Sequence, residues 1–191
     1  MTEESMLIQR ASKGDAEAFN TLMAQHERRM YAVALRMCAN PEDAQDCLQE
    51  AMIRVYRAIA DFKFQSTFST WIYRITMNTC LDELRRRKSR PNTSLDVLVD
   101  AGWSPTDERE TPEQHALRGE VRGRLSQFIQ ELPEDMRAAV VLRDIQGMAY
   151  DEIAEALDTN VGTIKSRISR GREKLREKIL SQSELFGRYD V

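Results

Sequence analysis

Apolar residues along this chain recur at the spacing of a helix, and this feature restricts its fold most strongly. In the first third, the apolar positions follow three- and four-residue steps, so they share one helix face: Phe19, Leu22, Met23, Met30, Val33 and Met37. No stretch shows a convincing strand-like alternation of apolar and polar residues, and the sequence carries no internal repeat. The sequence therefore predicts an all-α protein.

Local signals place several helix boundaries. Gly14 is typical of a helix end, and Asp15 of the start of the next helix. Asn40 can cap a helix whose first residue is Pro41, because proline fits a position that needs no N–H donor. A further helix is predicted from residue 67 or 69 to about residue 88.

The character of the chain changes after this helix. Pro91, Gly102 and Pro105 interrupt a stretch without a sustained helical period, which predicts a flexible linker. Thr111 then resembles a cap in front of a new helix at Pro112. We expect two small helical domains and two flexible segments: domain residues 1–90, linker residues 91–111, domain residues 112–181 and tail residues 182–191.

Charge is sorted along the chain. The 28 Lys and Arg against 31 Asp and Glu give a net charge of −3, which by itself predicts no nucleic-acid partner. However, five of the six residues 85–90 are basic, residues 92–115 carry a net −5, and residues 163–178 a net +5. An acidic linker between two modules that bind polyanions has this distribution, and so does a solvated surface.

The sequence predicts a soluble, cytoplasmic protein. The N-terminus carries early acids and no long apolar core, unlike a signal peptide, and the longest apolar run, residues 138–142, is too short to span a bilayer. Cys38, Cys47 and Cys80 are odd in number and widely spaced, so we expect buried reduced thiols and no disulfide framework.

Residues 149–175 have the pattern of a helix-turn-helix. A tight turn at Thr159–Asn160 separates two short apolar faces: Ile153, Ala154 and Leu157, then Val161, Ile164 and Ile168. The second helix of such a motif can enter the DNA major groove, where hydroxyls and cations contact phosphates and base edges. The alternative is a helical hairpin whose cations are only solvated.

A second candidate lies in the stretch FKFQSTFSTWIYR, residues 62–74. Aromatic rings interleaved with cations suit single-stranded DNA, because bases stack on rings while cations hold phosphates. The alternative is plain core packing, which the residue types favour for Phe68 and Trp71.

Four motifs in a fixed order resemble bacterial RNA polymerase sigma factors of the extracytoplasmic-function class. They are KGDAEAFNTL, DAQDCLQEAMIRVYRAI, FSTWIYRITMNTCLDELRRRK and LPEDMRAAVVLRDIQGMAYDEIAEALDTNVGTIKSRISRGREKL. The resemblance covers about residues 5–180. It implies a protein that binds core RNA polymerase, recognises the −35 duplex and captures the melted −10 strand of a promoter.

The resemblance also assigns residues by their matching positions. The polymerase-binding helix would use Asp43, Asp46, Gln49, Glu50, Ile53 and Arg54; without the resemblance, this is an ordinary acidic face. The pocket for a flipped −10 base would use Phe62, Lys63, Ser66, Phe68, Arg74 and Asn78. The −35 helix would use Lys165, Ser166, Arg167, Ser169 and Arg170.

Three positions depart from the family pattern. Phe64 stands where a small residue is common, which leaves the base preference of the pocket open. Asn160 replaces a frequent proline before the second helix of the helix-turn-helix, and we expect it to cap that helix equally well. Cys47 replaces an aliphatic residue and is interpreted as a small buried apolar residue, not a ligand.

The resemblance further implies regulation by an anti-sigma factor, which in this family can be membrane-bound, and a path for the acidic linker toward the polymerase active-site cleft. The sequence has no phosphate-binding glycine loop, zinc spacing or paired histidines, so we expect no enzyme activity, metal or cofactor. Two other hypotheses stay open: a DNA-binding regulator with a sensing N-terminal domain, and a protein-interaction module that binds no DNA.

Overall fold

A computed structural model of the chain describes residues 2–88, 112–182 and 186–187. The predicted linker and most of the predicted tail lie outside these residues. The elements in chain order are α1 (Glu3–Ala11), α2 (Ala16–Cys38), α3 (Pro41–Ala58), η1 (Ile59–Asp61), α4 (Phe68–Lys88), α5 (Pro112–Gln130), α6 (Glu134–Val140), η2 (Val141–Ile145), α7 (Tyr150–Ala156) and α8 (Val161–Ser181). Within the described ranges there is no strand, so the all-α prediction is confirmed.

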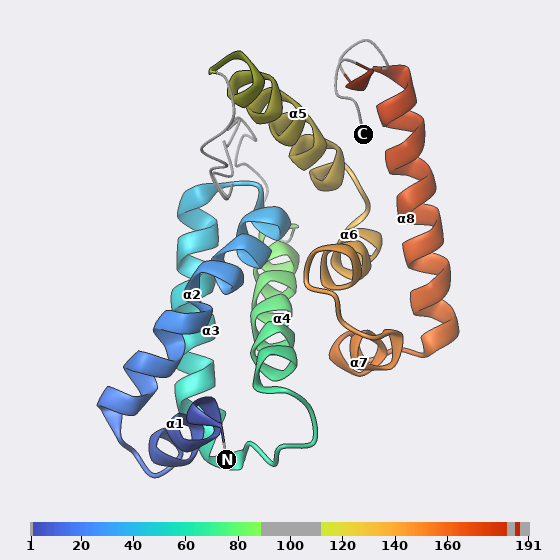
Figure 1. Ribbon diagram of the computed structural model, residues 1–191. Coiled ribbons are helices and arrows are strands. Elements are labelled where there is room, and N and C mark those ends of the chain that lie inside the picture. The colour runs from blue at the N-terminus through green and yellow to red at the C-terminus, as the bar shows by residue number, and fades with distance from the viewer. Residues whose placement is uncertain (1, 89–111, 183–185, 188–191) are drawn as a thin grey trace.

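Helices α1–α4 form the first packed unit, on the left of Figure 1. The predicted apolar face of α2 is buried in it, with Leu22, Met30 and Met37 fully enclosed. Leu48 of α3 and Ile72 of α4 complete this core. Burial of such side chains stabilises a fold by roughly 1.5–3 kcal/mol each.

The predicted boundaries in this unit are confirmed by their caps. Gly14 has a φ of +91°, a left-handed conformation that glycine adopts without steric strain. The Asp15 carboxylate accepts a hydrogen bond from the Ala18 N–H at 3.0 Å, and the Asn40 side chain accepts one from the Glu42 N–H at 2.8 Å. These bonds satisfy donors that have no partner inside the helix.

Helices α6, α7 and α8 with the π-helical turn η2 form the second unit, on the right of Figure 1. Ile153, Ile164 and Ile168 lie in its core, as predicted for the two faces of a helix-turn-helix. Val161 was also expected in this core, but 36% of its surface is exposed. It is the first residue of α8, where the helix has not yet turned its apolar face toward α7.

The two units touch. The Arg137 side chain of α6 donates to the Met37 carbonyl at the end of α2, at 2.7 Å. Lys88 at the end of α4 pairs with Glu134 of α6 at 3.1 Å. Polar contacts therefore hold the units together, and one of them joins residues that are 100 positions apart.

Candidate nucleic-acid interface

The aromatic loop between η1 and α4 is built around Phe62. Its ring lies 4.8 Å from that of Phe64, 5.6 Å from Phe68 and 5.1 Å from Trp71, between ring centres. Phe68 and Trp71 are buried, as the core-packing alternative predicted, and Phe64 is 53% exposed with a φ of +57°. The loop thus has a packed base and one ring held out toward solvent.

A hollow of about 110 Å³ lies under this loop. Its walls combine two aromatic rings with charged and polar side chains: Asp61, Phe62, Lys63, Gln65, Ser66, Trp71, Arg74 and Glu155. Four of the six predicted −10 residues therefore line this hollow: Phe62, Lys63, Ser66 and Arg74. Of the other two, Phe68 supports the loop from below and Asn78 is exposed farther along α4.

One wall of the hollow comes from the second unit. The Arg74 guanidinium pairs with the Glu155 carboxylate of α7 at 2.5 Å, and the Thr70 hydroxyl donates to Glu152 of α7 at 3.0 Å. Glu152 also accepts the Ala149 N–H at 2.8 Å and so caps its own helix. Glu152 and Glu155 of α7 thus bond to Thr70 and Arg74, which are polar residues near the start of α4.

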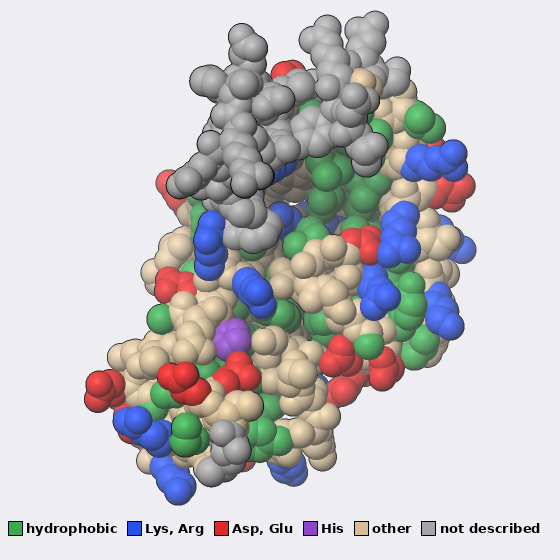
Figure 2. Space-filling model, viewed as in Figure 1, with side chains coloured by type: hydrophobic (Ala, Val, Ile, Leu, Met, Phe, Trp, Pro, Cys, Tyr) green, Lys and Arg blue, Asp and Glu red, His purple; other side chains and the backbone are tan. Residues whose placement is uncertain are grey.

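The second helix of the helix-turn-helix, α8, is capped by Asn160, whose side chain accepts the Thr163 N–H at 2.8 Å. The prediction that asparagine keeps this turn is therefore confirmed. Lys165, Ser169 and Arg170 are exposed on the surface of α8. In Figure 2, basic side chains lie over α8 and acidic ones gather over α7.

The other two predicted −35 residues are more constrained. The Ser166 hydroxyl donates to the Thr163 carbonyl at 2.8 Å, so it is half-buried against its own helix. Arg167 pairs with Asp135 of α6 at 3.2 Å. Of the five predicted −35 residues, three are thus exposed, and Ser166 and Arg167 are held by bonds within the protein.

Sequence reasoning missed Tyr150 at the start of α7. Its ring centre lies 4.6 Å from the Arg143 guanidinium carbon and 6.0 Å from the Lys165 ammonium nitrogen. These distances suit cation–π attraction and position both cations beside the motif. An aromatic residue at the first turn of the leading helix, near a cationic stretch, is the signal that was available.

The predicted polymerase-binding residues lie on α3, and four of them share its exposed surface: Asp46, Gln49, Glu50 and Ile53. Ile53 is 45% exposed and Tyr56, which was not predicted, is 51% exposed. Two large apolar side chains on one helix surface, flanked by acids, are typical of a protein-binding site.

The remaining two residues of this set fix α3 to α4. Arg54 contacts Glu50 at 2.9 Å and Asp82 at 3.0 Å, and these hydrogen bonds, first to Asp82 and then to Glu50, raise the pKa of Arg54. Asp43 pairs with Arg87 of α4. Both residues therefore hold the helix that carries the exposed face.

Comparison with known proteins decides the family. The model of Sigma-70 region 2 matches residues 22–90 and that of Sigma-70 region 4 matches residues 122–175. The RNA polymerase sigma-H factor of Pseudomonas aeruginosa is 37% identical over 177 residues, which are 91% of this chain and 92% of that protein. This chain belongs to the ECF RNA polymerase sigma factors.

A further ECF sigma factor is similar in sequence, and two solved structures share the fold. The ECF RNA polymerase sigma-E factor of Escherichia coli is 36% identical over 92% of this chain and 94% of that protein. CnrH, solved in complex with the cytosolic domain of CnrY, has a TM-score of 0.67 at 23% identity and covers 94% of this chain and 99% of its own. Bartonella quintana RpoE, solved with the anti-sigma factor NepR, also has 0.67, at 20% identity and 86% and 98% coverage. Among the described helices of this sigma factor, none is long and apolar enough to cross a membrane.

Proposed function

We propose that this sigma factor uses the hollow under the Phe62–Phe68 loop to hold a base of the melted −10 strand. A flipped base needs aromatic faces for stacking and polar groups for its edge, and both line the hollow. Lys63 and Arg74 supply positive charge for phosphates. The hollow is the observation that carries the proposal.

The helix-turn-helix reads the −35 duplex in this proposal. Lys165, Ser169 and Arg170 present two cations and a hydroxyl to solvent on the second helix of the motif, which is the helix that enters the major groove. Arg167 and Ser166 join them only if their internal bonds are exchanged for bonds to DNA.

The exposed surface of α3 binds core RNA polymerase. Asp46, Gln49 and Glu50 are exposed on the same helix as Ile53, and Tyr56 adds a second exposed apolar side chain. A basic helix with an apolar groove is the complementary partner. The proposed domain boundaries are residues 1–90 for polymerase and −10 binding, and residues 112–181 for −35 binding.

In this proposal, an anti-sigma factor regulates the protein. Bartonella RpoE was solved with the anti-sigma factor NepR, and CnrH was solved with the cytosolic domain of CnrY. The protein works in the cytoplasm without entering the membrane. It has no catalytic activity of its own and needs no cofactor for promoter recognition, because polymerase performs the chemistry.

The test is reconstituted transcription. Purified protein, bacterial core RNA polymerase and a promoter library are combined, and transcripts are mapped by their start sites. We expect start sites that depend on the protein. Arg74→Ala and the double variant Lys165→Glu with Arg170→Glu should each lower the yield about 10-fold or more, since a lost DNA contact costs about 1–3 kcal/mol.

Lys13→Glu is the matched control, because Lys13 is exposed in the turn between α1 and α2. It should leave the yield unchanged. If core polymerase is not bound and no promoter gives protein-dependent transcripts, the proposal fails. Tight binding of the isolated protein to duplex DNA, without polymerase, would instead support a regulator with a sensing N-terminal domain.

A further inference from the structure

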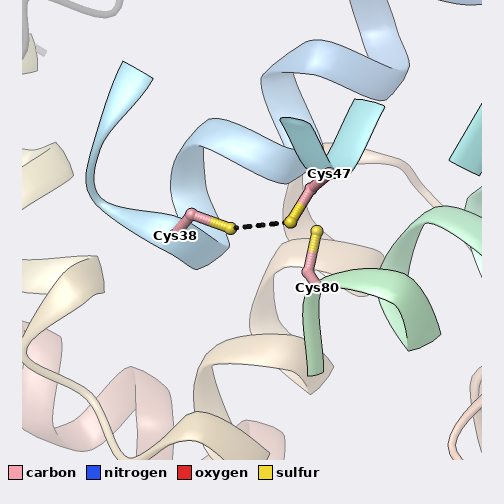
Figure 3. Close-up of side chains that lie close together, drawn as sticks. All are labelled: Cys38, Cys47 and Cys80. Carbon is pink, nitrogen blue, oxygen red and sulfur yellow. Dashed lines mark hydrogen bonds between the residues drawn. The ribbon is translucent and has the colours of Figure 1, made fainter. Parts of the chain in front are cut away.

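Three cysteines from three helices meet in the core of the first unit. Cys38 ends α2, Cys47 lies in α3 and Cys80 in α4, and their Sγ atoms all lie within 4.8 Å of one another (Figure 3). The Sγ atoms of Cys38 and Cys47 are 3.5 Å apart. Their exposed fractions are 4%, 3% and 0%, so water does not surround any of the thiols. Core packing requires small apolar side chains here, but it does not require three sulfur atoms to converge.

We propose that Cys38, Cys47 and Cys80 form a three-thiolate site for a soft metal ion, with Cu(I) as its best-suited ion. Metal–sulfur bonds of about 2.3 Å, arranged around a central ion in a plane, place the sulfur atoms about 4 Å apart. The separation of 3.5 Å between the Cys38 and Cys47 sulfur atoms, and the upper limit of 4.8 Å for all three pairs, are compatible with that value. Thiolate ligands select Cu(I), zinc and iron–sulfur clusters over hard ions.

The ligand count separates these ions. A structural zinc site is almost always four-coordinate. In the part of the chain that the structure describes, no fourth His, Cys, Asp or Glu joins the three cysteines. The site therefore fits an ion that is satisfied by three sulfur ligands.

A disulfide is the competing use of these thiols. Its S–S distance is about 2.0 Å, so Cys38 and Cys47, with sulfur atoms 3.5 Å apart, are two free thiols in this structure. It would also leave Cys80 without a role. The metal site uses all three sulfur atoms with little movement of the helices.

Nearby cations can offset the charge of the site. Metal binding releases the thiol protons and leaves excess negative charge, which must be paired inside a core. Arg137 reaches the carbonyl of Met37, the residue before Cys38, and its buried Nε has no hydrogen-bond partner. Burial lowers the pKa of Arg137, and negative charge at Glu134 and, to a smaller extent, at Cys38 opposes that effect.

Arg87 adds a second cation near the cluster, and its charge partly opposes the rise in the pKa of Cys38 that the hydrogen bond with Cys47 causes. It is shared with Asp43 and Glu83, so only part of its charge is available. Because the thiols are almost fully buried, the ion can enter only through local opening of the helices. Slow release of the bound ion is therefore expected.

The experiment is an anaerobic titration of the full-length, reduced protein with Cu(I) against a coloured Cu(I) chelator. We expect one ion per chain, three sulfur ligands by X-ray absorption spectroscopy and a raised midpoint of thermal unfolding. A parallel titration with Zn(II) should show weaker binding. No promoter DNA is used, so the outcome is independent of the proposed function.

Cys47→Ala and Cys80→Ala should each weaken Cu(I) binding by more than roughly 100-fold, the upper range for losing a residue that only orients a ligand. Met77→Leu is the control, because it removes a buried sulfur outside the cluster. Circular dichroism reports whether the variants fold. If the variants do not fold, the number of sulfur ligands bound to Cu(I) in the unchanged protein tests the proposal.

Several results would overturn the site. They are the absence of Cu(I) binding, binding that persists in both cysteine variants, and coordination of Cu(I) by fewer than three sulfur atoms. A Cys38–Cys47 disulfide found by mass spectrometry in protein that binds no Cu(I) would assign the cluster to thiol oxidation instead.

Discussion

At the scale of single residues, His26 joins α1 to the core of α2. It is only 6% exposed, its Nε2 lies 3.1 Å from a Glu4 oxygen, and its ring centre lies 5.4 Å from that of Phe68. Burial lowers the pKa of His26 below 6.5, and the Glu4 carboxylate only partly opposes that effect, while Arg29 adds to it. The neutral imidazole is therefore the form that the fold favours.

This burial predicts a pH dependence of stability. The unfolded chain binds the proton more readily, so the contribution of His26 is complete above pH 6.5 and is lost as the pH falls through the lowered pKa. The slope is at most about 1.4 kcal/mol per pH unit. An NMR titration of the ring signals should give a midpoint below 6.5, with His26→Gln identifying the signals. A midpoint at or above 6.5 would contradict the prediction.

At the scale of helices, the element types and most boundaries were predictable from the sequence, because caps such as Asp15 and Asn40 act through their immediate neighbours. The core of the helix-turn-helix was predictable from periodicity, apart from Val161. The convergence of the cysteines was not predictable, since they are 9 and 33 positions apart and lack the short ligand spacing that is typical of zinc motifs. The role of Glu155 in the hollow was also hidden, because it depends on the packing of α7 on α4.

The contact between α6 and α8 depends on one glycine. A Cβ atom at Gly171 would lie 2.8 Å from a methyl carbon of Val140. Gly171→Ala should lower the free energy of unfolding by up to about 2 kcal/mol, because overpacking costs about 1–3 kcal/mol and the gain in helix propensity offsets only about 1 kcal/mol of it. Urea denaturation measures the change.

Gly123→Ala on α5 is the control for this prediction, because no atom outside its own helix backbone lies within 4 Å of the added Cβ atom. It should raise stability by up to about 1 kcal/mol. Equal effects of the two substitutions would show that the contact between α8 and α6 has room for a methyl group at residue 171.

At the scale of the whole molecule, the two units close over the site proposed for −10 DNA. If Arg74 contacts a DNA phosphate, as proposed above, it must first release Glu155, so the described arrangement would be the closed form in that proposal. The pair is partly exposed, with side-chain exposures of 35% and 70%, and a pair of this kind is worth at most about 1 kcal/mol. Its loss should shift the balance between closed and open forms without unfolding either unit.

Glu155→Gln should therefore strengthen binding of a −10 single strand by up to about 5-fold, the equivalent of about 1 kcal/mol. Fluorescence anisotropy with a labelled oligonucleotide measures it. Glu173→Gln makes the same change of charge at an exposed position on α8 and should have a smaller effect. Equal gains in both variants would mean that only net charge matters.

In the proposed function, Glu155 competes with DNA for Arg74, and both side chains belong to the same chain. A group tethered in the same chain has an effective concentration that geometry sets, in the millimolar range for a short flexible connection, and that dilution does not alter. Making more of the protein therefore does not relieve the competition. Under the proposed function, a partner that separates the two units would relieve this competition, and binding of DNA in the hollow would then depend on assembly with polymerase.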